Sequence, residues 1–219
     1  MSEPEPTYRD GVRAVAPLTI AAFGFGVSFG VLARAAGMGW LEPIVMSATT
    51  FGGSAQFAAV SVLEEGGSVV AATVAAVLLN ARYAPIGITV APYLHGSRRS
   101  RFVRAQLIVD ESWAVASRGD GRFDPRILIG AGLAFYAAWV GGTSVGALGG
   151  RLLGDPATLG LDAAFPALFL ALLAPQLTSR QPRLAAVLGA VIAAALIPVA
   201  PPGVPIIAGA MACLLGLRR

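Results

Sequence analysis

Long apolar stretches, separated by short segments rich in glycine, proline or arginine, dominate this sequence. A helix rises about 1.5 Å per residue, so about 20 largely apolar residues cross the roughly 30 Å hydrocarbon core of a bilayer. The chain of 219 residues is 56% hydrophobic and only 13% charged, with a mean hydropathy of +0.72. Soluble domains are about 25% charged, and disordered chains are poor in apolar residues. The sequence therefore predicts an all-α, polytopic helical membrane protein.

About seven apolar segments are expected along the chain. They cover residues 12–36, 41–63, 68–94, 127–148, 161–177, 184–200 and 205–217. Residues 1–10 are expected to be a disordered cytoplasmic N-terminus, followed by a single transmembrane domain over 11–219. The segment 118–125 combines glycine, proline and charge, so it is the clearest linker.

The second apolar segment is interrupted at its centre. Gly52 and Gly53 unsettle a helix there, and Ser54 and Gln56 add polar groups within the next turn. Lipid tolerates irregular backbone only where protein or a water-filled cavity satisfies its polar groups. This pattern predicts a broken or re-entrant helix, which either forms a binding site or is an ordinary kink.

The third apolar segment carries an arginine halfway along its length. Arg82 lies between Asn80 and Tyr83, and a charge at the bilayer centre costs at least about 2.5–3.5 kcal/mol unless it is paired or faces water. A guanidinium binds a carboxylate with two parallel hydrogen bonds, so it suits an anionic or zwitterionic solute. Gln56 and Asn80 have a second explanation as plain hydrogen-bond partners between helices.

Three carboxylates also lie in apolar surroundings. Asp110 and Glu111 are adjacent in the stretch 106–117, which is too short to span alone, and Asp162 lies in a later segment. A carboxyl group inside a membrane can take up and release a proton as access alternates. Two explanations stay open: these groups couple transport to protons, or Arg82 pairs with one of them and holds helices together.

The two halves of the chain resemble each other. Residues 28–32 are similar to 144–148, and Glu42 to Gln56 has the same spacing as Asp162 to Gln176. Repeats over 11–117 and 126–217, joined by the linker, would place a site at their interface. The arginine-rich loop 95–104 is cytoplasmic by the positive-inside rule. That rule and an inverted repeat give different topologies, so the handedness of the repeat stays open.

Several functional classes conflict with the residue inventory. All 16 basic residues are arginines, so a phosphate-binding loop with its lysine is excluded. One histidine and one cysteine exclude an intrachain disulfide and a Cys/His zinc cluster. Adjacent carboxylates on a helix point about 100° apart and do not converge on a reacting group. We therefore expect no enzymatic activity, no metal and no cofactor. The arginines between apolar stretches indicate the orientation of the chain in the bilayer rather than nucleic-acid binding.

Five motifs, in order along nearly the whole chain, resemble the AzlC-type branched-chain amino acid permeases. They are GVLARAAG at 30–37, FGGSAQF at 51–57, LNARY at 79–83, DESWA at 110–114, and GLD at 160–162 followed by PALF at 166–169. Gly52 departs from the pattern, because the family more often has alanine there, and this puts substrate preference in doubt more than activity.

The resemblance implies a secondary transporter that exports leucine, isoleucine, valine and sometimes methionine across the bacterial inner membrane. It also implies that the chain is the multi-pass large subunit beside a small AzlD-type membrane partner. The motif positions give the candidate site. Expected substrate-binding residues are Gly52, Gly53, Ser54, Gln56, Asn80, Arg82 and Tyr83, and expected proton-coupling residues are Asp110, Glu111 and Asp162. The alternative is a channel-like or scaffold subunit without carrier activity of its own.

Overall fold

The computed structural model describes residues 5–118, 121–153, 170, 173–174, 177, 179–201 and 204–212. Helices make up most of this part, with one isolated β-bridge between Ser117 and Phe123. The all-α prediction is therefore confirmed for the described residues. The helices are α1 (Tyr8–Ala35), α2 (Leu41–Thr50), α3 (Gly53–Glu64), α4 (Val69–Asn80), α5 (Tyr83–Val90), the 3-10 turn η1 (Ala91–Tyr93), α6 (Arg98–Ala105), α7 (Asp110–Ala116), α8 (Pro125–Leu153), α10 (Arg180–Leu196) and α11 (Val204–Ala210).

Two of these helices are long and apolar enough to cross a bilayer. They are Tyr8–Ala35 and Pro125–Gly150, and the bent pair Val69–Asn80 with Tyr83–Tyr93 adds a third if the pair forms one broken span. The described residues thus support two or three spans, and the number of about seven apolar segments stays a prediction. The segment at 161–177, with Asp162, lies outside the described residues.

Packing divides the chain into two compact units. Unit 1 comprises Met1–Arg34, Met38–Gly52 and Ala81–Leu153, and unit 2 comprises Ala35–Gly37, Gly53–Asn80 and Gly154–Arg219. The units do not coincide with the two halves that the repeat would join, because the linker 118–125 lies inside unit 1. The chain passes between the units at Gly52–Gly53 and at Asn80–Ala81, next to the motifs with the strongest functional signal.

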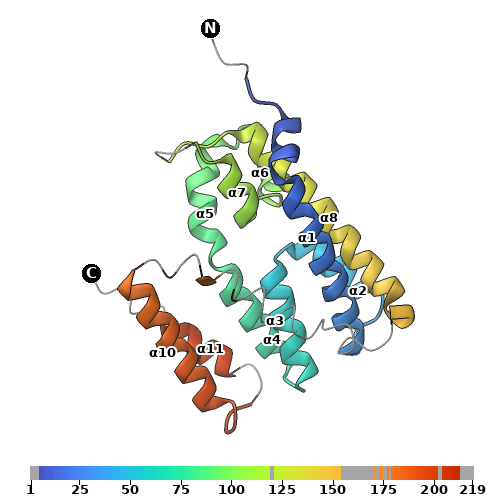
Figure 1. Cartoon of the computed structure of the whole chain (residues 1–219), viewed down its shortest axis with the longest axis vertical. Helices are drawn as coiled ribbons and strands as arrows, with labels where there is room; N and C mark the ends of the chain where they lie inside the picture. Colours follow the sequence, from blue (N-terminus) through green and yellow to red (C-terminus); the bar gives the residue numbers. More distant parts are fainter. Residues whose placement is uncertain are drawn as a thin grey trace. The chain divides into compact units, whose positions relative to one another are not determined.

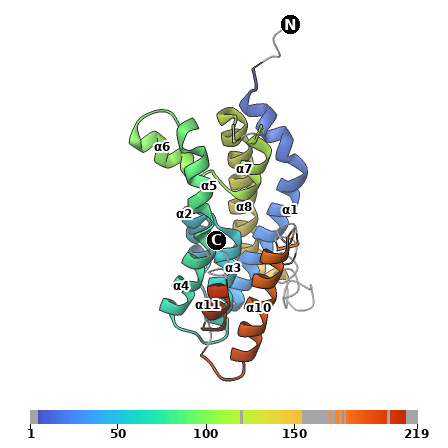
Figure 2. The same cartoon turned by 90° about the vertical axis from the view of Figure 1, so that its left-hand side faces the viewer.

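Glycines let α1 and α8 of unit 1 pack backbone to backbone (Figures 1 and 2). A Cβ atom added at Gly26 would lie 2.6 Å from the Trp139 carbonyl oxygen, and one at Gly142 or Gly146 would meet the backbone of α1. Small residues at such spacings allow close approach of membrane helices. Gly26 and Gly30 therefore form a face of α1 that packs against the backbone of α8.

In unit 2, a turn over 65–68 folds α4 back along α3 (Figure 1). Gly66 takes a left-handed φ of +82°, and the Gly67 amide donates to the Val62 carbonyl at 2.8 Å, which ends α3. Ser68 caps α4 by accepting from the Ala71 amide at 3.1 Å. Helices α10 and α11 also pack on each other (Figure 2).

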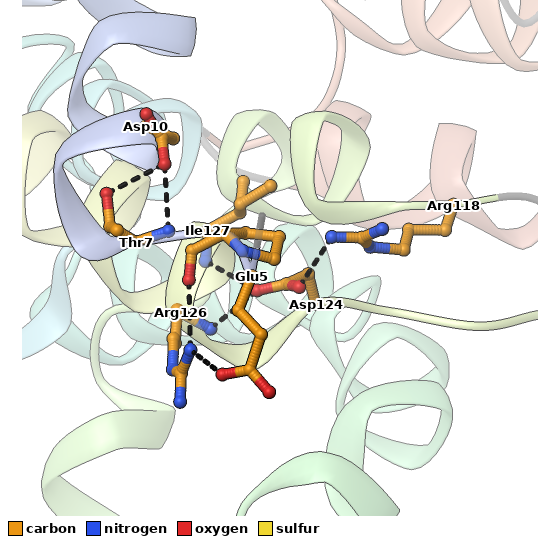
Figure 3. A network of polar contacts seen from close by, with 8 residues as sticks. Glu5, Thr7, Asp10, Arg118, Asp124, Arg126 and Ile127 are labelled. Carbon is orange, nitrogen blue, oxygen red and sulfur yellow. Dashed lines mark hydrogen bonds and ion pairs between the residues drawn. The ribbon is translucent and has the colours of Figure 1, made fainter. Parts of the chain in front are cut away.

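Acidic side chains that accept hydrogen bonds fix where α1 and α8 begin (Figure 3). The Thr7 amide and hydroxyl donate to Asp10 at 2.8 and 2.7 Å, and Asp124 accepts from the Arg126 and Ile127 amides at 3.0 and 3.1 Å. Arg126 also donates to Glu5 at 2.7 Å. Helix α1 starts at Tyr8, so residues 8–10 are helical although the sequence analysis expected them to be disordered.

A small core holds α7 against α5 and α8. Val90, Leu94 and Leu128 are buried in it, together with Phe123, whose ring lies 5.5 Å from that of Trp113. The Trp113 indole donates to the Thr89 hydroxyl at 3.0 Å, which links α7 to α5. These contacts set the position of the first turn of α7, which carries the adjacent carboxylates.

Candidate functional site

The break after α2 is set by an unusual backbone conformation at Phe51. Its φ of +41° makes Phe51 the one non-glycine with positive φ among the described residues. A left-handed conformation costs an ordinary residue about 1–2 kcal/mol, so neighbouring contacts must hold it. The Phe51 ring meets the Tyr136 ring edge-on at 5.1 Å. Gly52 is buried, and Gly53 begins α3, so the predicted interruption of the second segment is confirmed.

Side chains from other elements satisfy the carbonyls that α2 leaves free at its end. The Tyr136 hydroxyl donates to the Ala48 carbonyl at 2.9 Å, and the Gln106 amide group donates to the Thr49 carbonyl. Membrane helices end inside apolar surroundings only when such partners exist. The backbone break after α2 is therefore stabilised by hydrogen bonds within unit 1.

A second polar contact anchors the middle of α2. Thr143 donates to the Trp139 carbonyl at 2.9 Å, so the Ser47 hydroxyl, 2.9 Å from the Thr143 oxygen, donates to Thr143. Both side chains are fully buried. A satisfied buried pair fixes α2 on α8 and leaves no donor of Thr143 for a solute.

The second break brings Arg82 to the start of α7. Its Nε atom lies 3.1 Å from the Asp110 Oδ2 atom, and about a third of each side chain is exposed. The guanidinium also lies 5.1 Å from the centre of the Tyr83 ring, with Nη2 3.3 Å from the Tyr83 hydroxyl. The expected pairing of Arg82 with an acidic side chain is thus observed, and the pair remains reachable from outside the protein.

The first turn of α7 concentrates negative charge at the positive end of the helix. Asp110 and Glu111 occupy that turn, and Ser112 accepts from the Val109 amide at 2.9 Å. A helix N-terminus favours anionic side chains within its first turn. The Nε–H of Arg82 is not aligned with Asp110 as a hydrogen bond, so the contact is an ion pair whose guanidinium retains donors for another acceptor.

In unit 2, two polar atoms lie at the same end of the α3–α4 hairpin. Ser54 is near the start of α3 and Asn80 ends α4, so both are distant from the connecting turn. The Ser54 Oγ and Asn80 Oδ1 atoms are buried and have no hydrogen-bond partner among the described residues. Gln56, two residues further along α3, is fully buried. Buried polar atoms without partners are costly, and a bound solute or water would satisfy them.

The predicted site residues fall into separate groups. Arg82, Tyr83, Asp110 and Glu111 belong to unit 1, whereas Gly53, Ser54, Gln56 and Asn80 belong to unit 2. Asp162 lies outside the described residues. In the part that the structure describes, no group of three or more His, Cys, Asp or Glu side chains could hold a metal ion.

Sequence reasoning missed the side chains that support the first break. These polar side chains lie within or beside apolar segments, which is a sequence signal for a polar contact: Tyr136, Gln106 and Thr143. Their hydrogen-bond partners, however, are carbonyls and hydroxyls more than 50 residues away in the chain. Backbone carbonyls have no sequence signature. Only the fold shows that these side chains cap α2.

Together, long apolar helices and an ion pair set among them define an integral membrane protein of helical type. The family model described as AzlC protein matches residues 17–153. The chain belongs to the AzlC family, as its five motifs predict. It is 33% identical over 207 residues to a protein of Archaeoglobus fulgidus named "Uncharacterized membrane protein", covering 94% of this chain and 91% of the relative.

A second relative comes from Escherichia coli K12. The protein named "Inner membrane protein YgaZ" is 28% identical over 188 residues, which cover 80% of this chain and 75% of the relative. No solved structure matches the chain. These relatives and the family match support a membrane location for the protein.

Proposed function

We propose that this protein is a secondary transporter for hydrophobic amino acids and that the Arg82–Asp110 ion pair receives the solute. The observation that carries the proposal is the 3.1 Å contact of two opposite charges at a helix break, with both side chains still partly exposed. A zwitterion can insert between such charges, with its carboxylate on Arg82 and its ammonium on Asp110. Charge balance is kept when the zwitterion replaces the direct contact of the two side chains, which lowers the cost of that exchange.

Proton coupling follows from the same geometry. The Asp110 carboxylate can hold a proton or the ammonium group of the solute, but not both at once. A carrier whose proton and solute compete for one group exchanges them across the membrane, which is the behaviour of an exporter driven by inward proton flow. Glu111, the next residue of α7, is the second candidate for the proton, and Asp162 is the third.

The remaining predicted residues complete the proposed site. Each stays a proposed contact of the solute within its own unit: Gly52 and Tyr83 in unit 1, and Gly53, Ser54, Gln56 and Asn80 in unit 2. The unpartnered oxygens of Ser54 and Asn80 support this role in unit 2, since each needs a hydrogen-bond partner. The apolar ring of Phe51, in the same unit as Arg82, is proposed to contact the solute side chain.

The substrate class and partner are proposed from the resemblance. Leucine, isoleucine and valine, with methionine as a further candidate, are the proposed substrates, and a small AzlD-type membrane protein is the proposed partner in a bacterial inner membrane. A pocket of apolar side chains separates such solutes by only about 1–3 kcal/mol per methylene, so several should be carried. The scaffold alternative is favoured by one observation, which is that the Arg82–Asp110 pair also links α5 to α7.

Leucine binding to the purified chain at a series of pH values tests the proposal. Affinity should fall as the pH drops, by up to about tenfold per pH unit for the exchange of one proton, because a proton on the carboxyl group displaces the ammonium. Asp110→Asn should bind more weakly at neutral pH and lose the pH dependence, and Arg82→Ala should lose binding. Arg9→Gln on the exposed start of α1 is the control and should behave as wild type.

Two results would oppose the proposal. Leucine binding that strengthens at low pH would mean that proton and solute bind together rather than compete. Unchanged binding in Arg82→Ala, with normal abundance and a monodisperse elution profile, would remove the arginine from the site and favour the scaffold alternative.

A further inference from the structure

The arginine-rich helix α6 lies directly after a proposed membrane span. The bent pair of helices ends at Tyr93, and α6 begins at Arg98, only a short turn later. In Figures 1 and 2, α6 lies at the same end of unit 1 as the first turns of α1 and α8. That end also carries arginines in those turns and in the loop before α8. They are Arg9, Arg13, Arg118, Arg122 and Arg126.

No acidic side chain in the described part of the chain neutralises the charges on α6. Arg98, Arg99, Arg101 and Arg104 take part in no ion pair among the described residues, whereas each of the nearby acids is engaged elsewhere. Glu5 pairs with Arg126, Asp124 with Arg118, and Asp10 with Thr7 and Arg13. The helix therefore presents an uncompensated positive surface.

Apolar side chains lie among these charges and are exposed. Phe102 is 75% exposed and Val103 64%, and Arg99 lies one turn before them on the same face of α6. Basic residues mixed with large apolar ones on a short helix are typical of a segment that lies in the headgroup region of a membrane. A helix facing bulk water would leave these apolar side chains without partners.

An open cavity of about 610 Å³ lies between this helix and the end of the preceding span. His95, Gly96 and Arg101 line its polar part. Its apolar part is formed by Ile88, Ala91, Pro92 and Leu94. The loop that forms the cavity is fixed, because Arg104 donates to the His95 carbonyl at 2.8 Å and Ser97 accepts from the Ser100 amide at 3.3 Å.

We propose that this cavity and the arginines of α6 form a binding site for one anionic phospholipid, such as phosphatidylglycerol. The phosphate would contact Arg101 and the neighbouring arginines, and an acyl chain would cover Ile88 and Leu94. Basic pockets on the cytoplasmic side of membrane helices bind such headgroups, and the mixed polar and apolar lining matches a lipid better than a soluble anion. The site is independent of the Arg82–Asp110 pair and of the proposed transport.

The test measures lipid binding to the full chain in a neutral detergent by native mass spectrometry. Short-chain phosphatidylglycerol is titrated against phosphatidylcholine with the same acyl chains. An arginine near an anionic surface contributes about fivefold in affinity, so Arg98→Gln/Arg99→Gln/Arg101→Gln should weaken phosphatidylglycerol binding at least about tenfold. The matched control Arg9→Gln/Arg122→Gln/Arg180→Gln removes three charges outside α6 and the cavity lining, two of them at the same end of unit 1, and should retain wild-type binding.

Each other outcome overturns the proposal. Equal binding of the two lipids by the wild-type chain would show that the headgroup charge is not recognised. Equal weakening in the two triple variants would show diffuse attraction rather than a site. Competition by glycerol phosphate at the same concentration as the lipid would assign the cavity to a soluble anion. Because the wild-type titrations answer two of these points, the test holds even if a variant fails to fold.

Discussion

The close packing of α1 on α8 makes two glycines of one helix respond oppositely to the same substitution. At Gly26, an alanine Cβ would lie 2.6 Å from the Trp139 carbonyl oxygen, 0.8 Å inside the 3.4 Å at which ordinary contact begins. At Gly24, two residues earlier, nothing lies within 4 Å of the added atom. The carbonyl belongs to a helix backbone and cannot turn aside, so α1 and α8 must separate.

The expected magnitudes follow from this geometry. Alanine in place of glycine in a helix raises stability by up to about 1 kcal/mol, and Gly24→Ala should show this full gain. Overpacking costs about 1–3 kcal/mol, so Gly26→Ala should be less stable than Gly24→Ala by that amount. A change of 1 kcal/mol in stability shifts the thermal unfolding midpoint of a chain of this size by about 2–4 °C. The unfolding midpoints of the two variants should therefore differ by at least about 2 °C.

Thermal unfolding of the detergent-solubilised protein, followed by size-exclusion fluorescence, is the assay. The same comparison in α8 uses Gly142, where an added Cβ would meet the Phe23 carbonyl, and Gly149, where nothing lies within 4 Å. If Gly26→Ala and Gly142→Ala are as stable as Gly24→Ala and Gly149→Ala, α1 and α8 do not pack through these glycines and the reasoning is wrong.

Two further predictions concern the supports of the site. Tyr136→Phe should cost about 1–3 kcal/mol of stability in the same unfolding assay, because the Ala48 carbonyl loses its hydrogen-bond partner while the ring contact remains. The control Tyr8→Phe, on the exposed start of α1, should cost no stability. Equal losses in the two variants would contradict the capping role of Tyr136. Trp113→Phe and Thr89→Val each remove one partner of the same hydrogen bond. The double variant should therefore bind leucine no more weakly than either single variant. Additive losses of affinity would show that this hydrogen bond does not position α7.

The apolar pattern was sufficient to predict the helical class and the breaks. Gly52 and Gly53 interrupt an apolar run, and the structure ends α2 at Thr50 and begins α3 at Gly53. The left-handed residue at the break is Phe51, although glycine tolerates that conformation at no cost. Propensity could not assign it to Phe51, because the contact with Tyr136 that accompanies it comes from a distant helix.

Charge in apolar surroundings was an equally good guide to the candidate site. Arg82 had to find a partner or water, and Asp110 and Glu111 were the carboxylates of the same half that we predicted as functional. The sequence could not choose between them, since both lie in one turn of α7. The structure selects Asp110, at 3.1 Å from the guanidinium. What the pair does in the membrane stays a proposal, because a structural ion pair and a solute site share the same residues.

The division into two units was beyond the reach of sequence reasoning. A linker rich in glycine, proline and charge suggested a boundary near residue 120, yet Asp124 and Arg118 pair with each other and Asp124 caps α8. Polar residues in a loop can serve as caps as well as hinges. The chain instead crosses between units at the two helix breaks, on either side of the short segment Ala35–Gly37, and after Leu153.

The most direct test of the central claim is leucine efflux from preloaded bacteria that lack their own exporters. The cells express this chain with and without a small AzlD-type partner, and efflux is followed with and without a protonophore. We expect efflux that collapses with the proton gradient in the wild-type chain and is insensitive to it in Asp110→Asn. Absence of leucine, valine and methionine efflux in every case, with the protein shown to be in the membrane, would contradict the account.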